Sequence, residues 1–278
     1  MRDADCVAFL QWALPRLDLR WRGFRKVHGQ VCKRLKRRMK ELGLEDVAAY
    51  RARLEADPDE WAALDGLCHI TISRFFRDSR IFEALALRVL PEIAARAARK
   101  QRDARFWSAG CASGEESYTL KILWDLEISS AYPGVGCSVT ATDVDQAMLE
   151  RARKGCYSRG SLRELPEAFV AQGFDRVGNL YCVKPKHREG VSILDQDLRH
   201  EAPDGPFDII LCRNVAFTYF EAPLQRDVLS RLVEHLAVPG YLVIGADERL
   251  PQEVDGLVPL SGVPEILKYT AISGRKPS

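Results

Sequence analysis

The sequence lacks any pair of cysteines at the spacing of a metal site. Its eight cysteines are widely and irregularly separated, and no two of them form a C-x-x-C pair. A zinc site or a disulfide framework is therefore not expected, and we expect no metal ion. The thiols are expected to be reduced and mostly buried, as in a reducing compartment.

Long apolar runs and a strong net charge are also lacking. No stretch approaches the roughly 18 apolar residues of a membrane span, and the N-terminal apolar run is too short and too polar-flanked for a signal peptide. The net charge is only +2, so no global field calls for a membrane surface or a nucleic acid. We expect a cytoplasmic monomer that does not bind nucleic acid.

The first 85 or so residues have the periodicity of helices. In CKRLKRRMKELG, Leu35 and Met39 recur at helical spacing, and Gly43 ends the pattern. Asp57-Pro58 marks a further helix boundary, and no strand pattern occurs in this part. We expect an all-helical N-terminal domain over residues 1–85 that carries a basic helix.

From Ala104 onward, short apolar runs alternate with helical stretches. Strands are predicted at ARFWSA, CSVTATD, GVSILDQD, FDIILCRN and GYLVIGAD. This alternation predicts an α/β domain over residues 86–278, with a doubly wound, mostly parallel sheet covered by helices on both faces. The irregular segment near residues 165–192 is expected to hold a small inserted β-subdomain.

The loop after the first predicted strand reads WSAGCASGEESY, with two glycines followed by two acids. Gly110 and Gly114 would let the backbone approach a ligand closely at the carboxyl end of the strand. Glu115 and Glu116 would repel the phosphate that a helix N-terminus otherwise attracts, but they suit a cation. This favours S-adenosylmethionine, which is cationic and has no phosphate. Alternatively, both acids only stabilise the helix dipole.

An acidic residue ends the second predicted strand, in VTATDVD. Acids at this position typically bind ribose hydroxyls, so Asp143 is a candidate ligand of an adenosine group. The alternative is that Asp143 only caps the following helix.

These motifs together resemble the CheR family, the S-adenosylmethionine-dependent protein-glutamate methyltransferases of bacterial chemotaxis. The matching stretches follow the family's order and read ITISRFFRD, WSAGCASGEESYTL, TATDVDQAMLERARKGCY, FDIILCRNVAFTYFEAPLQRDVLSRL and GYLVIGADE. The resemblance implies a Rossmann-like methyltransferase fold and the transfer of a methyl group to glutamate carboxylates, with a chemoreceptor helix as the acceptor.

The resemblance also implies roles for individual residues. Arg77 and Tyr219 would be catalytic, beside the transferred methyl group and the sulfonium. The cofactor would contact Ser73, Arg77, Gly110, Glu116, Asp143, Asp197, Leu198, Arg213 and Asn214. The basic helix would dock the acidic acceptor through Lys33, Arg34, Arg37 and Arg38, which predicts salt-sensitive binding.

The chain departs from the family pattern at several positions. CRNVAFTYF is one residue longer than the usual motif, which affects the register of Tyr219. Asp197 stands where asparagine is usual, Thr71 where asparagine is frequent, and Asp247 where a serine is usual. The β-subdomain segment Leu180 to Val191 is short, so we expect no tight binding of a receptor tether.

Two further classes of function stay open. A methyltransferase of this fold could act on a non-receptor protein, a small molecule or RNA, although the proline motif of base-modifying enzymes is absent from CRNVAF. The chain could also be a non-catalytic module that binds the cofactor, because fold alone does not establish function.

Overall fold

The computed structural model describes residues 2–270 and divides them into two compact units. The helical unit contains the described residues of Met1–Ile70 together with Val215–Gln225. The sheet unit contains those of Thr71–Asn214 and Arg226–Ser278. The sequence places the end of the helical part near residue 85. The structure places this boundary after residue 70 instead, because the helices that follow in the chain pack against the sheet.

The helical unit is built from short helices that begin at capping residues. Asp46 and Asp57 accept the backbone N–H of Ala49 and Asp59, and so cap α4 and α5. Leu35 and Met39 of α3 are buried, as their spacing predicts. The helices are α1 (Asp3–Ala13), η1 (Leu14–Leu17), α2 (Trp21–Phe24), α3 (His28–Glu41), α4 (Val47–Ala56), α5 (Pro58–Cys68) and α11 (Ala216–Tyr219).

The sheet unit contains a seven-stranded sheet in the order β6-β2-β1-β7-β8-β10-β9. The first five strands in this order run parallel, and β10 is antiparallel to both of its neighbours. The strands are β1 (Ala104–Ala109), β2 (Cys137–Asp143), β6 (Val191–Asp195), β7 (Phe207–Cys212), β8 (Leu236–Ile244), β9 (Leu257–Leu260) and β10 (Val263–Tyr269). The mostly parallel sheet expected from the alternation is confirmed.

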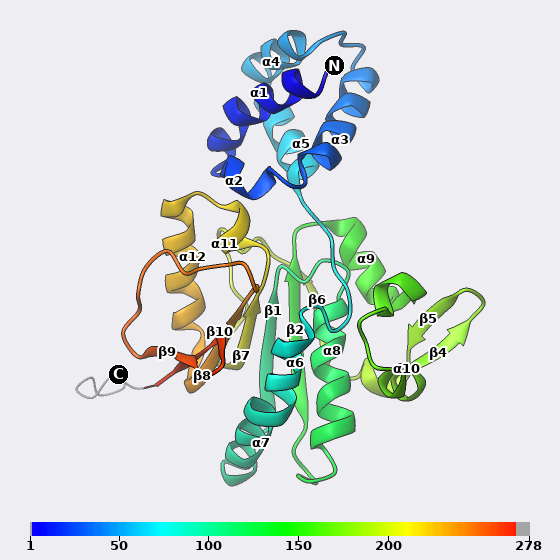
Figure 1. Cartoon of the computed structure of the whole chain (residues 1–278), viewed down its shortest axis with the longest axis vertical. Helices are drawn as coiled ribbons and strands as arrows, with labels where there is room; N and C mark the ends of the chain where they lie inside the picture. Colours follow the sequence, from blue (N-terminus) through cyan, green and yellow to red (C-terminus); the bar gives the residue numbers. More distant parts are fainter. Residues whose placement is uncertain (1, 271–278) are drawn as a thin grey trace. The chain divides into compact units, whose positions relative to one another are not determined.

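Helices cover this sheet, with α6, α7 and α8 lying over one face (Figure 1). Their apolar side chains pack against the β1 and β7 residues Phe106, Ile209 and Leu211. On the other face the ring of Trp107 packs at a tilt against that of Phe207, with ring centres 5.7 Å apart, because neighbouring strand residues point to opposite sides. The helices are α6 (Ser79–Ala84), the π-helical η2 (Leu85–Val89), α7 (Leu90–Arg99), α8 (Glu115–Leu123), the π-helical η3 (Trp124–Ile128), α9 (Gln146–Lys154) and α12 (Ala222–Glu234).

A second, three-stranded sheet lies between β2 and β6 in the chain, in the order β3-β5-β4. Its elements are β3 (Cys156–Ser158), η4 (Arg159–Leu162), α10 (Glu167–Gly173), β4 (Phe174–Val177), β5 (Leu180–Val183) and η5 (Pro185–His187). We call β3, β4 and β5 the small sheet. It begins at Cys156, before the segment in which the sequence predicts an insertion.

The expectation that all cysteines are reduced is wrong for four of them. Cys6 and Cys32 form a disulfide between α1 and α3, and Cys156 and Cys182 form one between β3 and β5. Each partner lies 26 residues from the other in sequence, and only the fold brings them together. The remaining cysteines are free thiols, namely Cys68, Cys111, Cys137 and Cys212.

Within residues 2–270, no helix is long and apolar enough to cross a lipid bilayer.

Candidate functional site

The carboxyl ends of β1 and β7 lie side by side where the strand order of the large sheet reverses. In open α/β sheets, ligands bind at such a switch point. The loop Gly110–Gly114 follows β1, and Arg213 and Asn214 follow β7. The sheet therefore brings together two of the segments that the sequence predicts as cofactor-binding.

The loop after β1 has an unusual backbone. Gly110, Ala112 and Gly114 have φ of 73°, 47° and 85°, a region that favours glycine. The N–H groups of Gly110 and Cys111 both donate to the carbonyl oxygen of Thr142, at 2.8 and 2.9 Å. A Cβ atom at Gly114 would lie 3.0 Å from the Cβ of Ala152. The loop is thus tightly packed against the end of β2 and the C-terminal part of α9.

Asp143 lies at the end of β2 and binds the same loop. Its Oδ2 accepts the N–H of Ala112 at 2.7 Å, and its Oδ1 accepts the N–H of Asp145 at 2.9 Å. The helix cap belongs to Asp145, whose side chain accepts the N–H of Met148. Asp143 therefore does not cap α9 itself, and its carboxylate stands beside the glycine loop.

The two acids that open α8 have different surroundings. Glu115 is buried and accepts a hydrogen bond from Ser113 Oγ at 2.8 Å. Glu116 instead faces the end of β7 and binds Arg213, with 2.5 Å between Oε1 and Nη1. Burial raises the pKa of Glu116, although the positive charges of Arg213 and Arg77 act in the other direction. An additional cation at this carboxylate would stabilise its ionised form.

Arg213 joins three segments at the site. Its side chain is fully buried, and Nη2 donates to Asp78 Oδ2 at 2.6 Å and to the carbonyl oxygen of Arg77 at 3.0 Å. The guanidinium carbon lies 5.1 Å from the ring centre of Phe82. Arg213 thus fixes the segment that contains Arg77 next to Glu116.

Arg77 and Ser73 lie on the stretch that leads into α6, and both are half-buried. Arg77 donates from Nη1 to the carbonyl oxygen of Ile72 at 3.0 Å. This bond uses one of the five N–H donors of a guanidinium. The backbone carbonyl oxygen of Arg77 accepts from Arg213, which also binds Glu116, so the three residues form one cluster.

Asn214 has a left-handed backbone, with φ of 58°. Its N–H and that of Gly245 both donate to Oε2 of Glu248, at 2.9 and 2.7 Å. Glu248 therefore ties together the loops after β7 and β8. Glu248 and Asp78 were not predicted as site residues, although each is an acid inside a matching motif.

Asp197 and Leu198 follow β6, whose end is paired with that of β2 through Asp195 and Asp143. Asp197 forms an ion pair with Arg199 at 2.7 Å, and Leu198 is buried. The acid that replaces the usual asparagine is thus balanced by a nearby guanidinium. The place of both residues at the adenine stays a prediction.

Tyr219 belongs to the helical unit, on α11. Its ring lies 5.0 Å from that of Phe24, measured between ring centres. Its catalytic role stays a prediction from the resemblance.

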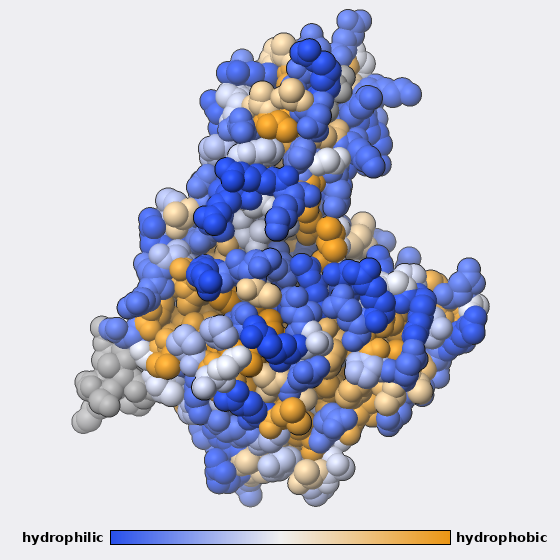
Figure 2. All heavy atoms as spheres, in the orientation of Figure 1, coloured by the Kyte–Doolittle hydropathy of each residue, from blue (hydrophilic) through white to orange (hydrophobic). Residues whose placement is uncertain are grey.

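Two of the four predicted docking residues are engaged within the helical unit. Arg38 binds Glu60 with both Nε and Nη2, at 3.0 and 2.7 Å, and Arg34 donates to the carbonyl oxygens of Leu67 and His69. The exposed cations of α3 are Lys33, Lys36, Arg37 and Lys40. Figure 2 shows that hydrophilic residues cover most of the visible surface of the helical unit.

The residues at the strand ends fit S-adenosylmethionine. Glu116 offers a largely buried carboxylate for the ammonium group, and Asp143 offers one for the ribose hydroxyls. Arg213 Nε and Asn214 Oδ1 are buried and have no hydrogen-bond partner among the described residues. Such atoms at a site call for a ligand or water. Within residues 2–270, no group of three His, Cys, Asp or Glu side chains could hold a metal ion.

Comparison with known proteins agrees with this geometry. Residues 71–263 match the family described as "CheR methyltransferase, SAM binding domain", and residues 28–64 match "CheR methyltransferase, all-alpha domain". The chain belongs to the CheR methyltransferase family. It is therefore a methyltransferase that depends on S-adenosylmethionine.

Several curated proteins are similar to this family member. The "Chemotaxis protein methyltransferase" of Salmonella typhimurium is 33% identical over 227 residues, which cover 78% of this chain and 75% of that protein. "Chemotaxis protein methyltransferase 1" of Pseudomonas aeruginosa is 38% identical over 182 residues, 63% of this chain and 65% of that one. An uncharacterised 104.1 kDa protein of Rhodobacter capsulatus is 32% identical over 84% of this chain, which spans only 24% of that protein.

Among solved structures, glycopeptide N-methyltransferase MtfA complexed with sinefungin is 17% identical with a TM-score of 0.32, over 56% of this chain and 49% of that one. So weak a likeness carries no argument.

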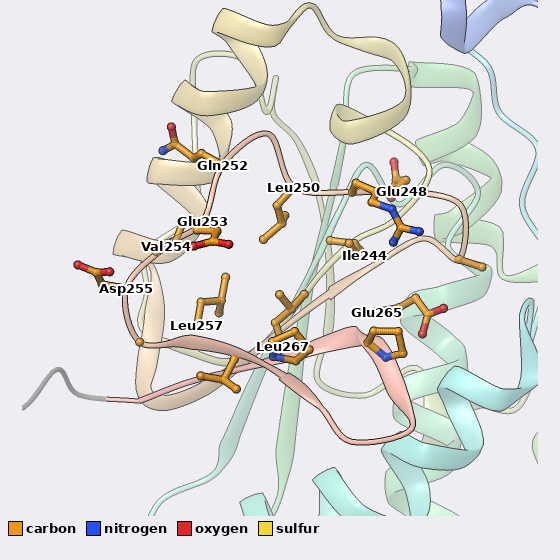
Figure 3. Close-up of a pocket in the computed structure, with 16 residues that line it drawn as sticks. Ile244, Glu248, Leu250, Gln252, Glu253, Val254, Asp255, Leu257, Glu265 and Leu267 are labelled. Atoms are coloured by element: carbon orange, nitrogen blue, oxygen red, sulfur yellow. The ribbon is translucent and has the colours of Figure 1, made fainter.

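A pocket of about 640 Å³ lies under the loop between β8 and β9 and shares Glu248 with the site (Figure 3). Leu250, Leu257 and Leu267 line it together with acids such as Glu253 and Asp255. It contains none of the residues that the sequence predicts for the cofactor. No sequence motif indicates this pocket.

Proposed function

We propose that this CheR family member transfers a methyl group from S-adenosylmethionine to glutamate carboxylates of a protein, with a chemoreceptor helix as acceptor. The observation that carries the proposal is the cluster of Arg77, Arg213 and Glu116 at the switch point of the sheet. It combines a cation-binding carboxylate with guanidinium groups that suit a carboxylate acceptor. The names of the chemotaxis methyltransferases similar to the chain support the same acceptor.

Methyl transfer to a carboxylate requires little acid–base catalysis by the protein. A glutamate with a pKa of about 4.3 is already ionised at pH 7. When bound, the donor supplies an electrophilic methyl carbon: the acceptor oxygen forms a bond to it, the carbon–sulfur bond breaks, and no proton moves. The work of the chain is to align the groups and to exclude water.

The chain's own residues divide this work. Glu116 would hold the ammonium group of the donor, and Asp143 would accept from the ribose hydroxyls. Arg77 would orient the acceptor carboxylate, since a guanidinium can hold it with two parallel hydrogen bonds. Arg213 acts mainly through its contacts with Glu116 and Asp78, which keep both donor-binding segments in place.

The exposed face of α3 is the proposed docking surface for the acceptor. Lys33, Lys36, Arg37 and Lys40 lie on it, opposite the buried Leu35 and Met39. Arg34 and Arg38, which the resemblance includes, have contacts inside the helical unit, so their part in docking is smaller. A cytoplasmic location, a monomeric state and the lack of tight tether binding stay predictions.

The direct test is to incubate the protein with methyl-labelled S-adenosylmethionine and a lysate of the source cells, and then to treat the labelled protein with mild base. Release of the label as volatile methanol is expected, because carboxyl methyl esters are hydrolysed by base. Label that resists base, or label in RNA or small molecules, would contradict the proposal that protein glutamate carboxylates are the acceptor. Binding of the donor without any transfer would indicate a non-catalytic module.

A further inference from the structure

Ala112 has a backbone conformation that is unfavourable for alanine. Its φ of 47° belongs to the left-handed region, where residues with a Cβ atom are uncommon. Such conformations persist only where the surrounding structure holds them, and they gather at ligand sites. The contacts that hold the loop after β1 therefore bear directly on donor binding.

Two side chains hold this loop on either side of the bond between Ala112 and Ser113. Asp143 accepts the N–H of Ala112 at 2.7 Å. Tyr157 donates from its hydroxyl to the carbonyl oxygen of Ser113 at 2.6 Å. Asp143 is already assigned to the donor site, but Tyr157 is not.

Tyr157 is a residue of β3 in the small sheet and is completely buried. Its ring meets that of Phe75 edge-on, with centres 4.8 Å apart. Phe75 lies between Ser73 and Arg77, and its N–H donates to the carbonyl oxygen of Ser161 at 2.9 Å. One tyrosine thus contacts both the loop after β1 and the segment that carries Arg77.

We propose that Tyr157 is a positioning residue for the donor loop. Its hydroxyl holds the Ser113 carbonyl and so keeps residues 111–114 in the donor-binding conformation before the donor arrives. The small sheet thereby becomes part of the donor site, although none of its residues needs to touch the cofactor. The inference rests on the donor half of the proposed function and does not depend on which acceptor is used.

The expected consequence is a loss of affinity rather than of chemistry. When only a fraction of the protein has the binding conformation, the apparent dissociation constant rises in inverse proportion to that fraction. Tyr157→Phe removes one hydroxyl and leaves the Ser113 carbonyl without its partner, while the ring contacts remain. We expect affinity for S-adenosylmethionine to fall about tenfold.

Tyr118 provides a matched control. It is also buried, with 2% exposure, and its hydroxyl donates to a backbone carbonyl, that of Ala152, at 3.0 Å. Its ring centre lies 6.4 Å from that of Tyr157. Tyr118→Phe therefore removes an equivalent buried hydrogen bond nearby without releasing the donor loop.

The experiment is calorimetric titration of the wild-type chain, Tyr157→Phe and Tyr118→Phe with S-adenosylmethionine and S-adenosylhomocysteine, with thermal unfolding of each. We expect both variants to lose similar stability, but only Tyr157→Phe to lose affinity. A loss below about threefold for Tyr157→Phe, or an equal loss for Tyr118→Phe, would overturn the proposal. Methyl transfer is not measured, so a wrong acceptor would leave the result unchanged.

Hydrogen exchange on the wild-type chain provides a second test, also usable should Tyr157→Phe not fold. The amides of residues 111–114 should already be protected in the absence of donor. Protection that arises only after addition of S-adenosylhomocysteine would show that nothing holds the loop beforehand, and the proposal would fall.

Discussion

Glu60 in the helical unit and Glu116 in the sheet unit are both largely buried glutamates, yet their pKa values are shifted in opposite directions. Glu60 receives two hydrogen bonds from Arg38 and one from the hydroxyl of Tyr50, and the Arg38 bonds in particular lower its pKa. Glu116 binds Arg213, but burial dominates and raises its pKa.

The difference supports our proposal that Glu116 is a functional charge, whereas Glu60 is a structural one. A buried carboxylate with all its partners stabilises the fold around it, whereas one that burial disfavours gains from an added cation. Glu60 of α5 is hydrogen-bonded to Arg38 of α3 and to Tyr50, so both of its carboxylate oxygens have partners. Glu116, in the first turn of α8, faces Arg213 after the end of β7, where the donor's ammonium group would complete its surroundings.

The largest expected effect comes from the disulfides, because each unit contains one that closes a loop of the same length. Loop-closure entropy predicts that each contributes about 3.5 kcal/mol. Cys6→Ser/Cys32→Ser and Cys156→Ser/Cys182→Ser should therefore lower the free energy of unfolding by similar amounts, measured by denaturant titration.

The two disulfides should differ in their effect on donor affinity. Cys156 precedes Tyr157, so loss of Cys156–Cys182 should also weaken binding of S-adenosylmethionine, while loss of Cys6–Cys32 should not. Equal affinity in both double variants would argue against a link between the small sheet and the donor loop.

Removing the charge of Glu116 tests the functional side of the comparison. Glu116→Gln should weaken binding of S-adenosylmethionine about a hundredfold, because the ammonium group loses its carboxylate partner. The free energy of unfolding should change little, since burial already disfavours the ionised form. Calorimetry and denaturant titration would check both. Gln in place of Glu115, which Ser113 binds, is the control and should cost much less affinity.

The same residue predicts how donor binding depends on pH. The donor's cation favours ionised Glu116, and a proton competes with it. Because the pKa of Glu116 is raised above 4.5, affinity should fall as the pH drops from neutral through this raised pKa. Titrations between pH 5 and pH 8 would show it, and the slope should vanish in Glu116→Gln.

Removing the charge of Glu60 tests the structural side. Glu60→Gln should lower the free energy of unfolding by about 2 kcal/mol, because it leaves Arg38 without its carboxylate. Donor affinity should stay within the error of calorimetry. Since the pKa of Glu60 is lowered from 4.5, its contribution is present above that value and is lost as the pH falls through the lower folded pKa.

The smallest expected effect concerns acceptor docking. Lys33→Glu/Arg37→Glu should weaken acceptor methylation about tenfold at low salt by raising KM, and the effect should shrink at high salt. Lys26→Glu, a change of an exposed cation outside α3, is the control. A loss that salt does not alter would contradict electrostatic docking.

Local patterns predicted much of this molecule. The spacing of Leu35 and Met39 predicted the buried side of α3, and the alternation after Ala104 predicted the mostly parallel sheet. The motifs also identified the family and its methyl donor. These features depend on neighbouring residues, or on short motifs that keep their meaning in any member of the family.

Other features could not be predicted from local patterns. No spacing indicates that Arg213 binds both Asp78 and Glu116, because only the sheet brings these segments together. Residues 215–225 belong to the helical unit although they lie between strands of the sheet, and the pairing of four cysteines was missed. Glu248 carried one weak signal, as an acid just after a strand.

By itself, the sequence determined the alternation of helices and strands in the sheet unit, the family and the identity of the methyl donor, because these follow from periodicity and motif. Only the tertiary structure decided which of two adjacent glutamates meets Arg213, and that a tyrosine of the small sheet holds the donor loop. Such pairings join residues far apart in the chain, and their energies exist only once burial and strand order have placed the groups within bonding distance.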